Sequence, residues 1–239
     1  MAKARPKKKR PRSKAQLAPD EIARRLAALY GEPVWRPHHD PMAELVLTIL
    51  SQNTTDTNSG RAFMRLVTRF PDWRQLMEAP VEKIEAEIAV GGLAKQKSPR
   101  IKASLEAVWE ARGSFELEFL NEMPLDDAKS WLRELKGVGP KTAACVLMFS
   151  FGRPALPVDT HVHRVGLRLG LVPDTTTAEQ ATLILEEMLP PEMVFPFHIL
   201  LIKHGRRLCK AQRPMCLECP LLDGCPFGQK LTKTKRAAV

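Results

Sequence analysis

Apolar residues recur at intervals of three and four positions along almost the whole chain, which is the spacing of one face of an α-helix. No run of alternating β-branched residues reaches the length of a strand. The predicted fold class is therefore all-α. The pattern indicates about ten helices, which cover residues 20–30, 42–50, 61–70, 81–89, 100–111, 125–135, 141–151, 160–169, 178–189 and 195–208.

Two of the predicted helices carry clear start signals. Asp40 followed by Pro41 combines a capping carboxylate with a proline that suits the first helical position. Thr177 and Gln180 are three residues apart, which is the spacing of a capping box. Helices are therefore expected to begin close to residues 41 and 178.

The composition is that of a globular protein. The chain has 239 residues, of which 44% are hydrophobic and 27% are charged, so it can bury a sizeable core. The longest apolar stretches, 43–50 and 142–151, are far shorter than the roughly 20 residues of a membrane span. The basic start is not followed by an apolar segment, so neither a secretory signal nor a membrane partner is expected.

The positive charge is concentrated at the two ends of the chain. The formal net charge is +10, of which residues 1–15 supply +8 and residues 230–239 supply +4, so the segment between them is close to neutral. Basic tails attract polyanions, of which nucleic acid is the expected partner. A solvated tail that only aids solubility is the simpler alternative, and residues 6–12 also resemble a nuclear-import signal.

Four cysteines are grouped near the C-terminus. Cys209, Cys216, Cys219 and Cys225 follow the pattern C-x6-C-x2-C-x5-C. Two disulfides would need an oxidising compartment, for which the sequence has no signal. Zinc sites usually have two separated pairs of close ligands, whereas one close pair with two looser ligands favours a [4Fe–4S] cluster. Zinc remains the alternative.

Two further features concern the basic residues of this loop and the remaining cysteine. Lys210 and Arg213 lie within the loop that a metal would hold rigid, so they either contact a phosphate backbone or offset the charge of the thiolates. The fifth cysteine, Cys145, stands alone in an apolar helix and is expected to be a small buried core residue.

A glycine-rich turn separates two of the predicted helices. Gly137 and Gly139, on either side of Val138, allow the chain to reverse within a few residues, and Pro140 suits the first position of the helix that follows. Backbone N–H groups at such a helix start can bind an anion. The segment is therefore predicted to be a helix–hairpin–helix motif that grips a DNA phosphate without reading sequence.

Lys141 and Asp159 are the candidate reactive groups. Lys141 falls in the first turn of a helix, where the positive helix end favours a neutral, nucleophilic amine that can form a Schiff base with a sugar carbon. A surface lysine that contacts phosphate is the alternative. Asp159 precedes a helix after two prolines and is either an N-cap or a carboxylate that faces a cleft. His161 and His163 do not share a helix face and are expected to be structural.

Taken together, these motifs resemble the endonuclease III family of helix–hairpin–helix DNA glycosylases. The segments that carry the resemblance are LKGVGPKTAACVL (135–147), VDTHVHRV (158–165) and the stretch from HGRRLC through the last cysteine (204–225). The resemblance implies that Lys141 is the nucleophile, that Asp159 is the essential carboxylate and that the four cysteines hold a [4Fe–4S] cluster. It also implies that a damaged base is turned out of the DNA into a cleft between two lobes.

The resemblance also implies the domain organisation. A six-helix barrel would occupy residues 35–153 and contain the helix–hairpin–helix at about 125–151, while a discontinuous cluster lobe would combine residues 16–34 and 154–228. Residues 1–15 and 229–239 would be basic tails.

Two loops depart from the family pattern. Asn53 occupies the position of a glutamine that fills the gap left by the turned-out base, so gap filling is either weaker here or taken over by Gln52. Leu93 matches a leucine that wedges between bases of the other strand, and Ala94 replaces a larger neighbour. The range of damaged bases therefore stays open at this point.

The predicted function is that of a bifunctional DNA glycosylase and AP lyase that removes oxidised pyrimidines in base excision repair. The partner would be double-stranded DNA with damaged bases or abasic sites, the protein would be a monomer, and its location would be cytoplasmic with the nucleoid, or nuclear if residues 6–12 act as an import signal. The alternatives are a mismatch glycosylase of the same fold, which generally lacks the lysine, and a non-catalytic metal-bearing DNA-binding module.

Overall fold

The computed structural model describes residues 17–36 and 40–237, with only the backbone for residues 234–237. All regular structure within these ranges is helical, so the predicted all-α class is confirmed. None of the described helices is both long enough and apolar enough to cross a membrane. The predicted basic tail 1–15 lies outside the described residues.

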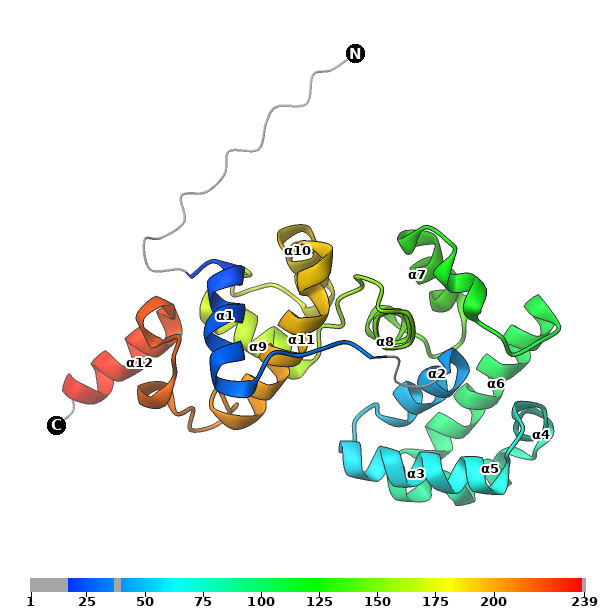
Figure 1. Cartoon of the computed structure of the whole chain (residues 1–239). Helices are drawn as coiled ribbons and strands as arrows, with labels where there is room; N and C mark the ends of the chain where they lie inside the picture. The colour runs from blue at the N-terminus through cyan, green and yellow to red at the C-terminus, as the bar shows by residue number, and fades with distance from the viewer. Residues whose placement is uncertain (1–16, 37–39, 238–239) are drawn as a thin grey trace, which may run out of the picture.

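The helices follow one another with short connections (Figure 1). The α-helices are α1 (Pro19–Tyr30), α2 (Pro41–Leu50), α3 (Asp56–Arg69), α4 (Trp73–Glu78), α5 (Val81–Ile88), α6 (Ala94–Arg112), α7 (Leu125–Glu134), α8 (Pro140–Phe151), α9 (Thr160–Leu169), α10 (Ala178–Met188), α11 (Pro191–Arg207) and α12 (Pro226–Ala237). Short 3₁₀ helices are η1 (Ala89–Gly91), η2 (Glu118–Asn121), η3 (Cys216–Glu218) and η4 (Leu222–Gly224).

The start signals act as predicted. Asp40 Oδ1 accepts hydrogen bonds from the backbone N–H groups of Met42 and Ala43, both at 3.1 Å, and α2 begins at the following proline. Thr177 and Gln180 form both arms of a capping box, at 3.2 and 3.0 Å. Local side-chain chemistry therefore fixes where α2 and α10 begin.

Three predicted helices begin at least four residues earlier than the sequence indicated, α3 at Asp56, α6 at Ala94 and α11 at Pro191. The last two contain an internal proline. The prediction started these two helices at residues 100 and 195, next to Pro99 and Pro196. In the structure both prolines lie inside, at the sixth residue of α6 and of α11. At that position each proline removes one backbone hydrogen bond, which the rest of a long helix tolerates.

Two helices were absent from the prediction. Helix α4 has only six residues and begins where Asp72 Oδ1 accepts from the N–H groups of Arg74 and Gln75. Helix α12 covers most of the segment that was interpreted as a C-terminal basic tail. Its lysines gave that segment the composition of a tail, but Phe227 anchors it under the Arg168 guanidinium, 4.3 Å from the ring centroid.

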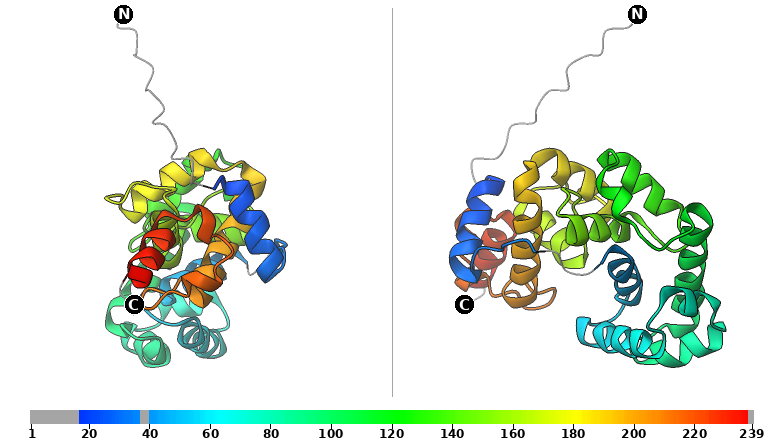
Figure 2. Two further views of the ribbon diagram at one scale, coloured as in Figure 1. Left: turned by 90° about the vertical axis from the view of Figure 1, so that its left-hand side faces the viewer. Right: turned by 45° about the vertical axis from the view of Figure 1, so that its right-hand side comes forward.

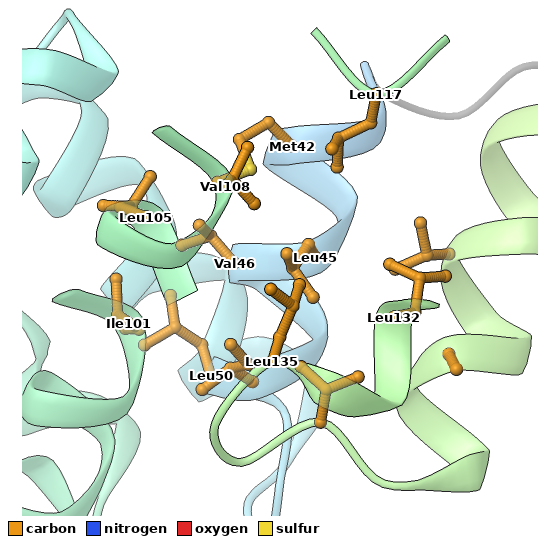
Figure 3. Close-up of a cluster of buried hydrophobic side chains, with 14 of the residues drawn as sticks. Met42, Leu45, Val46, Leu50, Ile101, Leu105, Val108, Leu117, Leu132 and Leu135 are labelled. Carbon is orange, nitrogen blue, oxygen red and sulfur yellow. The ribbon is translucent and has the colours of Figure 1, made fainter. Parts of the chain in front are cut away.

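The buried hydrophobic side chains form two clusters. The first contains residues of α2 through α8, and Figure 3 shows α2 at its centre, with Leu45, Val46 and Leu50 among the side chains of neighbouring helices. The second contains residues of α1, α9, α10 and α11. Figure 2 shows the two groups of helices side by side, and α8 contributes to both, since Leu147 belongs to the first cluster and Met148 to the second.

The second cluster joins segments from both ends of the chain. Helix α1 packs against α11, and the segment that leaves α1 returns to the middle of the molecule. There the Trp35 indole N–H donates to the Met148 carbonyl at 2.8 Å. The ring also covers Gly152, where a Cβ atom would come within 3.1 Å of it.

Candidate active site and cysteine loop

The glycine-rich turn joins α7 to α8. Gly137 has a φ of +86°, and a Cβ atom there would lie 2.9 Å from the Arg100 side chain, so both backbone geometry and space require glycine. Val138 is buried in the first cluster and its N–H donates to the Leu135 carbonyl at 3.0 Å. Nothing lies within 4 Å of a Cβ built on Gly139, so the turn is open on that side.

Lys141 is the second residue of α8 and is exposed. Helix α8 begins at Pro140 with Gly139 as its N-cap, and no side chain caps it. The amine therefore stands where the unpaired N–H groups of a helix start create positive potential. This is the position that a lysine nucleophile or a phosphate-binding lysine would occupy.

Asp159 is the N-cap of α9. Its Oδ1 accepts from the N–H groups of His161 and Val162 at 2.9 and 2.7 Å. Both capping bonds use the same oxygen, so the cap leaves Oδ2 for other chemistry. The capping role is therefore observed, and it is compatible with a catalytic one.

Lys141 and Asp159 act on the same two buried groups. Burial raises the pKa of the Cys145 thiol to about 12, and both charges contribute to it with opposite signs. Burial lowers the pKa of His198 to about 4, and the same two charges act on that ring in opposite directions. The starts of α8 and α9 therefore carry a cation and a carboxylate that both influence the same buried thiol and imidazole.

The remaining candidate DNA contacts are divided between two loops. Asn53 is exposed after α2 and Leu93 is 45% exposed before α6. Both have a left-handed backbone, with φ of 53° and 54°. Gln52 is half-buried, and its side-chain amide reaches the Gly137 carbonyl and the Thr142 hydroxyl, both at 3.4 Å. Asn53 is thus the more available side chain of the two.

The four cysteines line a single cavity. Cys209, Cys216, Cys219 and Cys225 surround it together with Arg168 and His204, and none of them forms a disulfide. Within the described residues, no three His, Cys, Asp or Glu side chains are already drawn together tightly enough to hold a metal ion. Lys210 and Arg213 are exposed on the same loop.

The donors around the sulfur atoms suit anionic thiolates. An Arg168 N–H donates to Cys209 Sγ at 3.3 Å, and the Gly228 backbone N–H donates to Cys225 Sγ at 3.4 Å. Burial raises the pKa of Cys219 to about 11, so this thiol is protonated until a metal displaces its proton. Four sulfur ligands, of which Cys209 and Cys225 receive such hydrogen bonds, fit a [4Fe–4S] cluster.

Sequence reasoning missed two residues of this cavity. Arg168 also donates to the carbonyls of Lys210 and Ala211, at 2.7 and 3.0 Å. The second is His204, whose Nε2 lies 3.6 Å from Cys219 Sγ and whose Nδ1 lies 3.1 Å from the Tyr30 hydroxyl. The HGRRLC spacing, which puts His204 five residues before Cys209, is the signal that could have indicated this.

The fold and this arrangement of residues agree with the comparisons to known proteins. Residues 46–191 match the HhH-GPD superfamily of base excision DNA repair proteins, and the chain belongs to that family. An endonuclease III of Thermotoga maritima is 35% identical over 214 residues, which are 90% of this chain and 95% of that protein. The predicted resemblance and the predicted enzyme class, a DNA glycosylase and AP lyase of base excision repair, are thereby confirmed.

Two further similarities describe the range of relatives. An Arabidopsis thaliana protein named as a DNA glycosylase is 41% identical over 162 residues, and the match spans 68% of this chain but only 55% of that protein. A solved structure of a trapped covalent intermediate between endonuclease III and DNA contains a protein chain that is 30% identical to this one, with a TM-score of 0.78. The match covers 90% of this chain and 99% of the solved chain. DNA binding by this fold is therefore directly documented in a relative.

Proposed function

We propose that this protein removes oxidised pyrimidines from duplex DNA through a Schiff base on Lys141 and then cleaves the strand 3′ to the abasic site. The observation that carries the proposal is the placement of Lys141 in the first turn of α8 and of Asp159 at the N-cap of α9, two helix starts whose charges both act on Cys145 and His198. A nucleophilic amine and a nearby carboxylate are the two groups that this chemistry requires.

The reaction divides into two bond-breaking steps. The lone pair of the Lys141 Nζ attacks C1′ of the damaged nucleotide, and the electrons of the glycosidic bond leave with the base, which takes up a proton. Opening of the sugar then yields a protonated imine. Loss of a proton from C2′ moves electrons toward the imine and expels the 3′ phosphate, and water finally releases the enzyme. The negative charge of Asp159 offsets the positive charge that develops on the sugar.

The DNA contacts follow from exposure. The open side of the turn at Gly139, together with Gly137, would hold one phosphate through backbone N–H groups, while the bond from the Val138 N–H to the Leu135 carbonyl keeps the turn in shape. Asn53 would fill the gap that the turned-out base leaves, and Leu93 would wedge between bases of the other strand. Lys210 and Arg213 would contact phosphates from the cysteine loop.

We further propose a [4Fe–4S] cluster on Cys209, Cys216, Cys219 and Cys225. It would supply a rigid, charged support for the basic loop, with the bond from Arg168 to Cys209 as one of its stabilising contacts. Zinc is the competing metal, and the iron content of protein purified without air separates the two. No step of the reaction on DNA passes through the metal.

We also propose that the protein acts as a monomer and that its location is cytoplasmic. All proposed site residues come from one chain, so a monomer is sufficient for the reaction. We also place its action on DNA in the cytoplasm, since the similar endonuclease III of Thermotoga maritima is a bacterial protein.

Borohydride trapping on duplex DNA with an abasic site tests the nucleophile. The wild type should become covalently linked to the DNA, Lys141→Ala should give no adduct, and Lys136→Ala should still trap because this exposed lysine lies in the turn but not in the helix start. Robust trapping by Lys141→Ala would remove it as the nucleophile.

A second variant separates the two roles of Asp159. In Asp159→Asn the amide oxygen can still accept from His161 and Val162, so α9 keeps its cap while the negative charge is lost. Base excision should fall strongly at unchanged thermal stability. Comparison of thymine glycol duplexes with G·T and adenine mismatches then tests the proposed substrate class, and preference for a mismatch would contradict it.

A further inference from the structure

Lys97 is a charged residue in the interior of the first hydrophobic cluster. Only 1% of its surface is exposed, although it lies in the fourth position of α6, a helix whose neighbouring Lys95 and Gln96 are exposed. Its ammonium group donates to two backbone carbonyls, that of Leu50 at 2.7 Å and that of Gly91 at 2.9 Å. Burial of a lysine ammonium group costs considerable free energy unless it is hydrogen-bonded. The two bonds therefore offset this cost, and the burial itself needs a structural reason.

The two carbonyls belong to the ends of two different helices. Leu50 is the last residue of α2 and Gly91 is the last residue of η1. Carbonyl groups at a helix C-terminus lack partners within the helix and carry negative potential, so a buried ammonium group stabilises both ends at once. Asn53 follows the first carbonyl by three residues, and Leu93 follows the second by two.

The same face of α6 also contacts the glycine-rich turn. Arg100 donates to the Gln52 side-chain oxygen at 3.3 Å, and its aliphatic part fills the space beside Gly137. Ser104 donates to the Lys136 carbonyl at 3.3 Å. Positions 97, 100 and 104 are spaced by three and four residues, so they lie along one stripe of the helix. Figure 3 shows Leu50 between Ile101 of α6 and Leu135 at the turn.

We propose that Lys97 is a positioning residue that fixes the Asn53 and Leu93 loops relative to each other, so that both enter duplex DNA together. The proposal rests on the DNA contacts proposed for Asn53 and Leu93. Asn53 and Leu93 both have a left-handed backbone and lie in short loops. The carbonyls that precede these loops, those of Leu50 and Gly91, accept from the same Lys97 ammonium group. Loss of that shared donor leaves both loops attached to the core but free to shift independently.

The chain offers a matched control on the same helix. Lys102 is a second lysine of α6, partly rather than fully buried, and it donates to the carbonyls of Met77 and Ala79 at the end of α4. Its bonds support an equivalent helix end, but no proposed DNA-contacting residue follows them closely in the sequence. A difference between the two lysines therefore reports positioning rather than general stability.

The experiment compares Lys97→Met, Lys97→Arg and Lys102→Met on two substrates. In duplex DNA with 2-aminopurine opposite a stable abasic analogue, binding should unstack the probe and raise its fluorescence. This readout needs no chemistry. Single-turnover trapping is measured in parallel on an abasic site in duplex and in single-stranded DNA, because a single strand has no gap to fill and no partner strand to wedge.

We expect Lys97→Met to lose most of the fluorescence rise and to react about ten- to hundredfold more slowly on the duplex, since displacement of a positioned group by about 1 Å costs up to a hundredfold. Its rate on the single strand should stay within about threefold of the wild type. Lys97→Arg keeps a donor and should recover part of the duplex rate, and Lys102→Met should behave as the wild type on both substrates.

Each outcome has a distinct meaning. Equal losses on duplex and single strand, or equal effects of Lys97→Met and Lys102→Met, would overturn the positioning role. Wild-type unstacking without any trapping would contradict the proposed lyase chemistry but not the inference, while no unstacking by the wild type would overturn the inference itself.

If Lys97→Met does not fold, a second variant of the same stripe replaces it. Arg100→Met removes a half-buried contact and should show a smaller duplex-specific loss. A loss shared by both substrates would again overturn the proposal.

Discussion

The part of the molecule around α2 and the loop with the four cysteines are stabilised by different means. Leu45, Val46, Ile49 and Leu50 of α2 are completely buried among apolar side chains of the surrounding helices. In the cysteine loop, Leu221 is completely buried as well, but Leu217 is 72% exposed. One region is a conventional hydrophobic core, and the other leaves a leucine of its loop largely in solvent.

Arginine side chains take the place of apolar burial in the cysteine loop. Arg164 donates to the Cys209 carbonyl at 3.1 Å, and Arg168, one helical turn later, donates to the carbonyls of Lys210 and Ala211. Arg25 of α1 donates to the Pro220 carbonyl at 3.0 Å. Such bonds satisfy the loop backbone but contribute modestly each, so the loop should depend on a metal, while the α2 region should not.

The largest effect is expected from removal of a metal ligand. Cys219→Ser should lose the bound metal completely and expose the backbone of residues 208–225, while α2 and its neighbours stay folded. Iron analysis measures the loss of the metal, and hydrogen exchange measures the exposure of the backbone in the two regions. Cys145→Ala is the control, because this buried cysteine lies outside the loop and should leave the metal content unchanged. Simultaneous loss of protection in both regions would contradict the proposed independence.

A cavity in the apolar core should have the opposite distribution of effects. Leu45→Ala removes a fully buried side chain and should lower the free energy of unfolding by about 2–5 kcal/mol, with the metal still bound in the folded fraction. Leu183→Ala changes a leucine that is 66% exposed and should cost less than about 0.5 kcal/mol. Urea unfolding followed by circular dichroism gives both values. A cost for Leu45→Ala no larger than that of Leu183→Ala would show that α2 is not the centre of the core.

Features that depend on neighbouring residues in the sequence were predictable. The cap at Asp40, the capping box at Thr177 and the turn around Gly137 each require residues only a few positions apart. The family assignment followed from three such segments. Local chemistry therefore gave both the fold class and the candidate reactive groups.

Features that depend on tertiary packing were not predictable in this way. Nothing near Lys97 in the sequence indicates that its amine reaches the ends of α2 and η1, which lie 47 and 6 residues away. The contact between His204 and Cys219 likewise spans 15 residues across a loop. Helix α12 was missed because its lysines suggested a basic tail, whereas its packing on α9 depends on Phe227 and Arg168.

The buried His198 should make stability depend on pH. Burial lowers its pKa to about 4 from an ordinary 6.5, so between these values the unfolded chain binds a proton that the folded chain rejects. The free energy of unfolding should therefore fall as the pH is lowered from 6.5 to 4, by up to about 3 kcal/mol from this group. His198→Gln should reduce the slope by one proton in urea titrations at several pH values. An unchanged slope would show that the folded protein protonates His198 freely.

The smallest effect on chemistry is expected from the N-terminal basic segment, which lies outside both regions. Deletion of residues 1–15 removes +8 of formal charge and leaves the turn, Lys141, Asp159 and the four cysteines in place. If the segment docks on DNA, the plot of log affinity against log salt should become shallower by about 0.9 for each phosphate that the protein no longer neutralises. The single-turnover rate at saturating enzyme should stay the same, because saturation removes the contribution of non-specific affinity. Replacement of Lys233, an exposed residue of α12, by Gln tests the other end of the chain and should change the slope by no more than about 0.9, the value for a single phosphate. An unchanged slope after the deletion would mean that residues 1–15 only solvate the protein, and a reduced single-turnover rate would mean that they help to form the site.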